Sequence, residues 1–238
     1  MATTRRYWAV IPAAGIGTRM HMETPKQYLT LHGRTILEYT LAGFCEHPSV
    51  SGIVVVLASG DPYWKTLTVS GHDKITTAVG GVERYHSVQN GLAALKGMAG
   101  DDDWVMVHDA ARPCLRREDI DHLIETLDDH PVGGILAIPV RDTMKRAGED
   151  NEISETIDRE SLWHALTPQM FRLRLLEQCL GQAIADHRPV TDESQAVEQA
   201  GYRPLLVPGN PDNIKITHRN DLPLAELFLS QQENSTCV

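Results

Sequence analysis

Residues 7–20 read YWAVIPAAGIGTRM, an apolar run that passes directly into a glycine-rich loop. An apolar run without polar alternation is typical of a strand with both faces buried, as in parallel α/β sheets. Small residues after such a strand let backbone N–H groups approach an anion such as a phosphate chain. The segment therefore predicts a buried first strand over Tyr7–Pro12, followed by a phosphate-binding loop.

The rest of the chain alternates between strand-like and helical patterns. The further runs that read as strands are Ile53–Leu57, Ile75–Val79, Trp104–Val107, Gly134–Pro139 and Leu205–Val207. The expected helices are Ile36–Glu46 (capped by Thr35), Glu83–Leu95, Asp119–Leu127, Arg172–Asp186, Asp192–Ala200 and Asp221–Leu229. We expect the polar tail 230–238 to fray. The alternation predicts an α/β fold: a Rossmann-like, three-layer, doubly wound and mostly parallel sheet.

Residues 139–161 interrupt this alternation with a polar segment. Two short strands, near Asp142–Arg146 and Ile153–Asp158, flank a loop that contains Gly148 and Asn151. An isolated hairpin is marginally stable in water. We therefore predict a dimerisation arm, inserted in a single domain over 1–238 and stabilised against a second copy of the chain. A plain surface excursion is the alternative.

Composition, charge and cysteines exclude several classes of protein. The 238 residues fit one large domain, and their net charge of −10 contrasts with the basic surplus of duplex-binding proteins. No apolar run approaches the roughly 18 residues of a membrane span, and no signal-peptide core precedes the first strand. The four cysteines, at 45, 114, 179 and 237, form no metal or disulfide pattern. We expect a cytoplasmic protein that binds neither nucleic acid nor a membrane.

The glycine-rich loop differs from the two commonest nucleotide motifs. It lacks the Gly-Lys-Ser/Thr of a P-loop, and Met20 stands where a dinucleotide fingerprint has its third small residue. Pro25 and Gly33 also delay the next helix. The loop instead carries Arg19 and Lys26, which suit phosphoryl or nucleotidyl transfer because charge builds up on phosphate oxygens. A tight turn without a ligand is the alternative.

A second candidate site lies at the end of the strand Trp104–Val107, where His108 and Asp109 follow. Ligands of open α/β sheets bind at the carboxyl ends of strands, and a carboxylate there can hold Mg²⁺. A cap for the following loop is the alternative role of Asp109. We expect His108 to be structural, because a phosphate monoester that acts as nucleophile is already an anion and needs no general base.

Further motifs accompany these sites in one order along nearly the whole chain. They are AAGIGTRM 13–20, PKQY 25–28, GGVERYHS 80–87, HDAARP 108–113, PVRDTMK 139–145, LTPQ 166–169, TDE 191–193 and DNIKIT 212–217. Together they resemble the nucleotide-diphosphosugar-type nucleotidyltransferases, specifically the 2-C-methyl-D-erythritol 4-phosphate cytidylyltransferases of non-mevalonate isoprenoid synthesis. The resemblance implies a Mg²⁺-dependent homodimer that transfers the cytidylyl group of CTP to methylerythritol phosphate and releases pyrophosphate.

The resemblance also implies roles for individual residues. The catalytic cations would be Arg19, Lys26 and Lys215. The residues that contact CTP would be Ala13, Ala14, Gly15, Gly17, Gly80, Gly81, Ser87 and Ala110. Asp109 would hold the metal and contact the polyol. The other residues for the acceptor would be Arg112, Thr143, Arg159, Thr167, Thr191, Asp192 and Asp212. Of these, Thr143 and Arg159 would grip the phosphate of methylerythritol phosphate from the arm of the neighbouring subunit.

Three other functions stay open at this point. A ribitol-5-phosphate cytidylyltransferase would share the fold, the nucleotide and the chemistry, although Ala110-Ala111, the arm residues 142–145 and Asp212 favour methylerythritol phosphate. An NAD-binding dehydrogenase is disfavoured by the missing third glycine. A non-catalytic nucleotide-binding regulator is disfavoured because Arg19, Lys26, Asp109 and Lys215 occur together.

Overall fold

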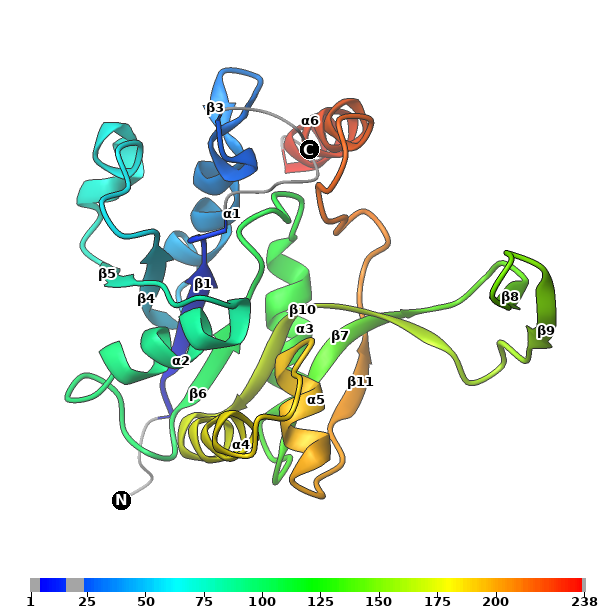
Figure 1. The fold of residues 1–238 in the computed structure, drawn as a ribbon. Coiled ribbons are helices and arrows are strands. Elements are labelled where there is room, and N and C mark those ends of the chain that lie inside the picture. Colours follow the sequence, from blue (N-terminus) through cyan, green and yellow to red (C-terminus); the bar gives the residue numbers. More distant parts are fainter. Residues whose placement is uncertain (1–4, 16–23, 237–238) are drawn as a thin grey trace.

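A seven-stranded sheet forms the centre of the molecule. The structure is a computed structural model and describes residues 5–15 and 24–236. The strand order is β11-β7-β10-β6-β1-β4-β5 (Figure 1). These strands are β1 Tyr7–Pro12, β4 Val50–Leu57, β5 Ile75–Val79, β6 Trp104–Val107, β7 Gly133–Pro139, β10 Trp163–Arg172 and β11 Leu205–Pro208. Every neighbouring pair without β10 is parallel, which confirms the predicted doubly wound, mostly parallel α/β sheet.

Helices cover both faces of the sheet. Side chains alternate along β1, so that Ala9 and Ile11 enter one hydrophobic cluster and Trp8 and Val10 enter another. The helices against the first cluster are α1 Ile36–Cys45 and α3 Arg117–Leu127, and those against the second are α2 Arg84–Ala94, α4 Leu173–Ala185 and α5 Glu193–Gln199. Two helical layers therefore enclose a sheet buried on both faces, as the unbroken apolar runs predict.

Shorter elements complete the fold between β1 and β5. They are the 3-10 helices η2 Lys26–Tyr28, η3 Trp64–Thr66 and η4 Thr68–Gly71, and the strand pair β2 Thr30–Leu31 and β3 Arg34–Thr35. Thr35 caps α1 as predicted: its hydroxyl accepts from the Glu38 N–H, and the Glu38 carboxylate accepts from the Thr35 N–H. This capping box satisfies backbone donors that the first helical turn leaves free.

The sequence patterns missed the strand β10. It lies antiparallel between β6 and β7, in the middle of the sheet. Its pairing with β7 is irregular between Ala165 and Gln169, the interval that contains Pro168. Proline has no N–H for a strand ladder and therefore tends to sit at such irregularities. That interruption hides the strand from a search for continuous apolar runs.

The expectation of a frayed tail from residue 230 is wrong for the part of the tail that the structure describes. Helix α6, Asp221–Thr236, continues through it. The Gln232 side chain donates to the Cys114 carbonyl at 2.9 Å and to Asp212 Oδ2 at 3.2 Å. These long-range contacts hold the last turns against the body, which a polar sequence alone does not reveal.

The predicted hairpin is present and projects from the body (Figure 1). Strands β8 Met144–Ala147 and β9 Ile153–Ile157 pair antiparallel as a separate two-stranded sheet. All four residues of β8 are exposed, and Ile153 in β9 is 66% exposed. An arm with so little burial of its own matches the prediction of a projecting element. That a second copy stabilises the arm stays a prediction.

Candidate active site

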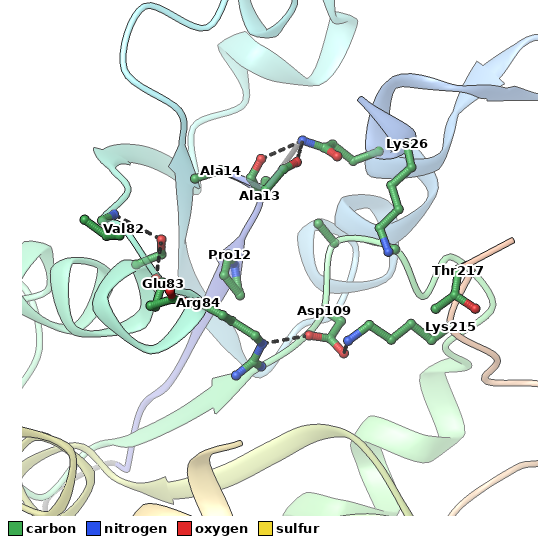
Figure 2. A pocket seen from close by; sticks show the side chains of 16 residues that line it. Pro12, Ala13, Ala14, Lys26, Val82, Glu83, Arg84, Asp109, Lys215 and Thr217 are labelled. Atoms are coloured by element: carbon green, nitrogen blue, oxygen red, sulfur yellow. Dashed lines mark hydrogen bonds and ion pairs between the residues drawn. The ribbon is translucent and has the colours of Figure 1, made fainter. Parts of the chain in front are cut away.

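A cavity of about 470 Å³ opens at the carboxyl ends of β1, β5 and β6. Nine residues proposed from sequence as catalytic or substrate-binding line it together: Ala13, Ala14, Gly15, Lys26, Gly81, Ser87, Asp109, Ala110 and Lys215 (Figure 2). The position agrees with the rule that open α/β sheets bind ligands beyond their carboxyl edge. Two further predicted residues, Gly17 and Arg19, lie outside the described residues.

The loop after β1 is anchored from beneath. The Ala13 N–H donates to the Val56 carbonyl at 2.8 Å, which continues the ladder between β1 and β4. The amide of Gln27 donates to the carbonyls of Ala13 at 2.7 Å and Gly15 at 3.1 Å. One buried side chain thus engages the carbonyls of Ala13 and Gly15 and fixes the first residues of the loop. Sequence reasoning missed Gln27, although it stands in the motif of residues 25–28.

The second glycine segment packs against this loop. A Cβ on Gly80 would lie 2.4 Å from the Ala14 side chain, so glycine is needed for the two segments to approach. The next N–H, of Gly81, donates to the Ser87 hydroxyl at 3.1 Å. Gly80 thus supports the cavity from behind its lining, while Gly81 and Ser87 form part of the wall.

Three cations surround the Asp109 carboxylate. Lys215 Nζ lies 2.8 Å from Oδ2, Arg84 Nε lies 3.1 Å from Oδ1 and Arg112 Nε lies 3.5 Å from Oδ2. Burial alone would raise the pKa of Asp109, but the charges of Arg84, Lys215 and Arg112 outweigh burial and hold its pKa below the ordinary value. Asp109 is therefore ionised at neutral pH.

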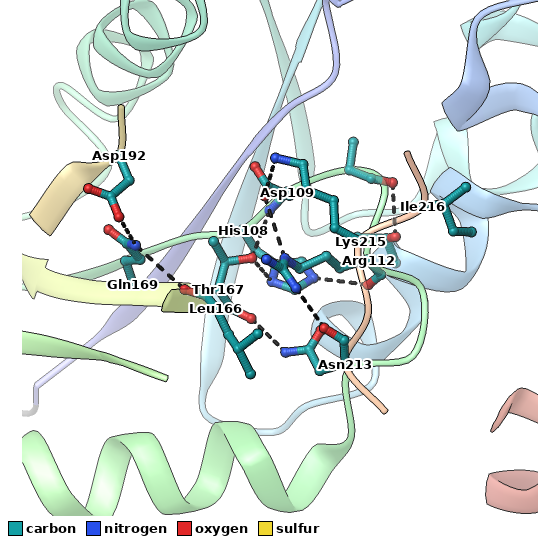
Figure 3. Close-up of polar contacts among 12 residues, drawn as sticks. His108, Asp109, Arg112, Leu166, Thr167, Gln169, Asp192, Asn213, Lys215 and Ile216 are labelled. Atoms are coloured by element: carbon teal, nitrogen blue, oxygen red, sulfur yellow. Dashed lines mark hydrogen bonds and ion pairs between the residues drawn. The ribbon is translucent and has the colours of Figure 1, made fainter. Parts of the chain in front are cut away.

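A buried polar layer fixes Asp109 from below (Figure 3). The Thr167 hydroxyl accepts from the Asp109 N–H at 3.2 Å and lies 2.9 Å from His108 Nδ1. His108 Nε2 lies 3.1 Å from the Arg112 carbonyl, so Nε2 carries the proton and the Thr167 hydroxyl donates to Nδ1. Burial lowers the pKa of His108 to about 4. A neutral, enclosed imidazole fits the structural role expected for His108.

The same layer ties the segment that carries Lys215 to the sheet. Arg112 Nη1 donates to the Asn213 carbonyl at 2.6 Å, and the Asn213 amide donates to the Thr167 carbonyl at 2.7 Å. Lys26 Nζ donates to the Ile216 carbonyl at 2.9 Å. Lys26 and Lys215 therefore meet at one segment although 189 positions separate them in the sequence.

Several residues predicted to bind the acceptor lie away from the cavity lining or beneath it. Thr167 and Arg112 are buried under Asp109. Asp192 caps α5 and accepts from the Gln169 amide, with Thr191 just before it. Asp212 pairs with Arg116 at 2.5 Å. Their role as acceptor contacts stays a prediction.

The remaining two predicted acceptor residues belong to the arm. Thr143 directly precedes β8, and Arg159 follows β9 and donates to the Arg141 carbonyl. The arm extends away from the body that contains the cavity (Figure 1). Within one chain, the structure therefore does not bring Thr143 or Arg159 to the cavity.

The donor set of the cavity suits a metal that arrives with a nucleotide. Among the described residues, no group of three or more His, Cys, Asp or Glu side chains is placed to hold a metal ion. Mg²⁺ is commonly held by one or two carboxylates together with water and substrate phosphates. Asp109, an ionised carboxylate on the cavity wall, fits that second arrangement.

Comparisons with known proteins agree with this geometry. The family model described as 2-C-methyl-D-erythritol 4-phosphate cytidylyltransferase (IspD) matches residues 7–231. The chain belongs to this family. The chain is thus an enzyme that transfers the cytidylyl group of CTP to 2-C-methyl-D-erythritol 4-phosphate, a step of non-mevalonate isoprenoid precursor synthesis.

Individual relatives support the same assignment. The Pseudomonas aeruginosa (strain UCBPP-PA14) protein of that name is 54% identical over 91% of this chain and 93% of its own length. The Vibrio vulnificus (strain YJ016) protein of that name is 49% identical over 95% of this chain and 95% of its own length. A crystal structure named 4-diphosphocytidyl-2C-methyl-D-erythritol synthase superposes with a TM-score of 0.83 at 39% identity, covering 96% of this chain and all of the other. The Francisella tularensis family structure gives 0.82 at 37% identity, with 94% and 99% covered.

Helix length and polarity bear on membrane insertion. Within residues 5–15 and 24–236, no helix is both long and apolar enough to cross a bilayer.

Proposed function

We propose that the cavity holds CTP with its triphosphate along Ala13–Gly15 and between Lys26 and Lys215. The observation that carries the proposal is that two lysines, the glycine-rich loop and the ionised carboxylate of Asp109 line one cavity, where Lys215 pairs with Asp109. The cavity lining carries three cations, Lys26, Arg84 and Lys215, against the two carboxylates Glu83 and Asp109, which leaves a surplus of one positive charge. A tetra-anionic triphosphate is attracted to such a site despite the net charge of the chain.

The segment 80–87 is our candidate for contacts to the cytosine base. Gly81 has no side chain to obstruct a flat base, and Ser87 is fixed by accepting from the Gly81 N–H. Ala110 lines the same cavity next to Asp109. A wall of main chain and small side chains leaves space for the nucleoside while the charged groups face its phosphates. Gly17 and Arg19 would extend the phosphate loop.

In the proposed reaction, a phosphate oxygen of methylerythritol phosphate attacks the α-phosphorus of CTP. A new P–O bond forms there, the bond from the α-phosphorus to the bridging oxygen of the β-phosphate breaks, and pyrophosphate leaves. Lys26, Lys215 and Arg19 stabilise the charge that accumulates on the transferred and leaving phosphates. No proton needs to be removed from the nucleophile, which agrees with a buried, neutral His108.

Mg²⁺ fits the site as a companion of the triphosphate. Asp109 would supply its protein oxygen, and the bound ion would neutralise phosphate charge and orient the leaving group. Lys215 is 35% exposed and pairs with Asp109 across the surface of the cavity. Its long side chain can therefore transfer its contact from Asp109 to a phosphate when the nucleotide binds.

The arm is our candidate for completing the site in a homodimer. Thr143 and Arg159 would reach the cavity of the partner subunit and contact the acceptor phosphate. The support for this is the projection of the arm and the exposure of its apolar side chains Met144 and Ile153. The planar fork of an arginine donates two parallel hydrogen bonds to a phosphate.

We also propose the organisation and location expected from sequence. Residues 1–238 would form one domain with 139–161 as the dimerisation arm. A reducing cytoplasm is supported by Cys45, Cys114 and Cys179, which are free and buried.

The test of the proposed function is pyrophosphate release from purified protein. CTP with methylerythritol phosphate should give rapid release, and chelation of divalent cations should abolish it until Mg²⁺ is restored. Ribitol 5-phosphate in a competition assay should be a poor acceptor. Equal use of the two acceptors, or full turnover without a divalent cation, would contradict the proposal.

A further inference from the structure

Glu193 is a buried carboxylate just outside the cavity. Its side chain is completely inaccessible, and it belongs to the first turn of α5. Both of its oxygens accept from one guanidinium: Arg84 Nη1 donates to Oε1 at 2.7 Å and Nη2 donates to Oε2 at 3.1 Å. This is the bidentate geometry in which arginine binds carboxylates most strongly. Glu193 does not line the cavity, so it does not contact a ligand there.

The same guanidinium also reaches the active site. Arg84 Nε donates to Asp109 Oδ1 at 3.1 Å, and Arg84 lines the cavity. Figure 2 shows Arg84 and Lys215 approaching Asp109 from opposite sides. Burial alone would lower the pKa of Arg84, but Glu193 and Asp109 together raise its pKa. One planar cation is thus shared between an active-site carboxylate and a carboxylate behind it.

The contacts of Arg84 with Asp109 and Glu193 join three segments for which we expect different functions. Arg84 is the first residue of α2 and follows Gly80-Gly81, the segment we assign to the nucleotide. Asp109 follows β6. Glu193 follows Thr191 and Asp192, which are predicted to serve the acceptor. Arg84 therefore connects the nucleotide segment to the acceptor segment through its contact with Glu193. It also contacts Asp109, the carboxylate that both substrates are expected to approach.

A fully buried carboxylate is costly unless it is paired and hydrogen-bonded. Glu193 in turn restricts the orientation of Arg84. Because Nη1 and Nη2 both donate to Glu193, only Nε of the guanidinium remains to donate to Asp109. Without Glu193, the guanidinium could turn and bind both oxygens of Asp109. That would compete with Lys215 and Arg112 for Oδ2 and would move Asp109 away from its present orientation.

We propose that Glu193 is a positioning residue that holds Arg84 so that Asp109 keeps its present orientation, with Oδ1 on Arg84 and Oδ2 on Lys215. The proposal deepens the proposed function, since it rests on Asp109 as a contact of the acceptor. Glu193 acts only through Arg84. The nucleotide loop at Ala13–Gly15 has its own anchor in Gln27 and does not depend on this pair.

The experiment compares Glu193→Gln, Arg84→Lys and the double variant. Glutamine keeps the volume of Glu193 but removes its charge, and lysine keeps the charge of Arg84 but cannot form the planar fork. Each single change should raise the KM for methylerythritol phosphate about tenfold to a hundredfold, as loss of an outer partner does at other sites. Because Glu193 does not line the cavity, the dissociation constant of CTP for Glu193→Gln, measured by calorimetry without acceptor and without a divalent cation, should stay close to the wild-type value.

If Glu193 and Arg84 act through one contact, their effects on the acceptor KM will not add. The double variant should raise the acceptor KM no more than the larger single change, because either substitution already breaks the contact. Glu177→Gln is the matched control, since it removes the ion pair of Lys96 with helix α4 at 3.0 Å on the surface. It should leave both constants unchanged.

Two results would overturn the positioning role. One is an unchanged acceptor KM in folded Glu193→Gln, and the other is an equal loss of CTP and acceptor affinity, as general loosening of the site would produce. Asp109→Asn separates this from the proposed function. If Asp109→Asn itself leaves the acceptor KM unchanged, the proposed role of Asp109 fails; if Asp109→Asn raises it and Glu193→Gln does not, only the positioning role fails.

Discussion

At the scale of single residues, the site depends on how one carboxylate is surrounded. Asp109 has an Arg or Lys nitrogen within 3.5 Å on both oxygens, and its N–H is held by Thr167. These contacts keep Asp109 charged and fix its orientation. When a phosphate-bound cation arrives, the partly exposed Lys215 has to move from Asp109 to a phosphate, while Arg84 and Arg112 can keep their contacts.

Lys26 is the residue whose loss should show most directly in turnover. Lys26→Ala should lower kcat by on the order of 10²–10³, because it removes one positive charge from the transferred and leaving phosphates. Steady-state pyrophosphate release at saturating CTP and acceptor measures the effect.

The control for Lys26 is a lysine with a similar contact elsewhere. Lys74 Nζ donates to the His47 carbonyl at 2.8 Å, as Lys26 does to Ile216, but lies outside the cavity. Lys74→Ala should keep wild-type kcat. A Lys26→Ala enzyme as active as that control would remove Lys26 from the catalytic role.

At the scale of elements, helices α1 and α3 are pinned beneath the sheet by one histidine. His47, just after α1, has a fully buried side chain and lies 3.0 Å from Asp121 Oδ1 on α3. The Ser49 N–H donates to His47 Nδ1, so Nε2 carries the proton and donates to Asp121. Burial lowers the pKa of His47 below the ordinary 6.5, although Asp121 opposes the shift.

The sign of that shift predicts an acid-sensitive contact. Because the folded pKa of His47 is the lower one, the unfolded chain binds this proton more readily, and stability is lost as the pH falls below about 6.5. The free energy of unfolding, from urea titrations at pH 7.5, 6.5 and 5.5, should therefore fall more steeply in wild type than in His47→Gln. Parallel pH profiles for the two proteins would contradict the prediction.

At the scale of the whole molecule, the arm is the element on which the proposed homodimer depends. Met144 and Ile153 are 37% and 66% exposed on a two-stranded sheet without a core of its own. We propose that these side chains are covered by a second copy of the chain, because the hairpin has so little core of its own. Arg159 does not line the cavity of its own chain, which fits the proposal that it serves the partner's cavity.

Assembly should respond to a charge on the arm. Ile153→Asp should convert a dimer to a monomer, since desolvating an unpaired carboxylate in an apolar interface is unfavourable. Light scattering coupled to size exclusion measures the mass. Ile153→Val, which keeps an apolar side chain at the same place, should leave the dimer intact; a dimeric Ile153→Asp protein would count against the arm as the interface.

Mixed dimers test whether the arm serves the partner's cavity. Arg159→Ala has an intact cavity and a defective arm, and Lys26→Ala has the reverse. After reassortment of equal amounts, about half of the dimers are mixed and each has one intact site of two, so about a quarter of wild-type activity should return. No gain over the separate variants, with mixed dimers verified by mass, would show that each arm serves its own chain.

The sequence alone determined the first strand, the start of the first long helix and the class of chemistry, because each follows from residues close together in the chain. The apolar run at 7–12 specifies a strand buried on both faces wherever it pairs, and Thr35 with Glu38 specifies a helix start within four residues. The motifs at 13–20, 108–113 and 212–217 indicate the chemistry because they carry the resemblance to the family whose model matches residues 7–231. None of these inferences needs contacts between distant segments.

The tertiary structure decided what depends on long-range pairing. Strand β10 is recognisable only once β6 and β7 bind it on both sides, and the last turns of α6 persist because Gln232 meets Cys114. The same holds for the cavity: only packing shows that Thr167 and Arg112, which stand in motifs far apart in the sequence, both contact Asp109. Glu193 becomes relevant only when folding brings α5 to the start of α2, because a buried carboxylate takes its role from the cation that it meets.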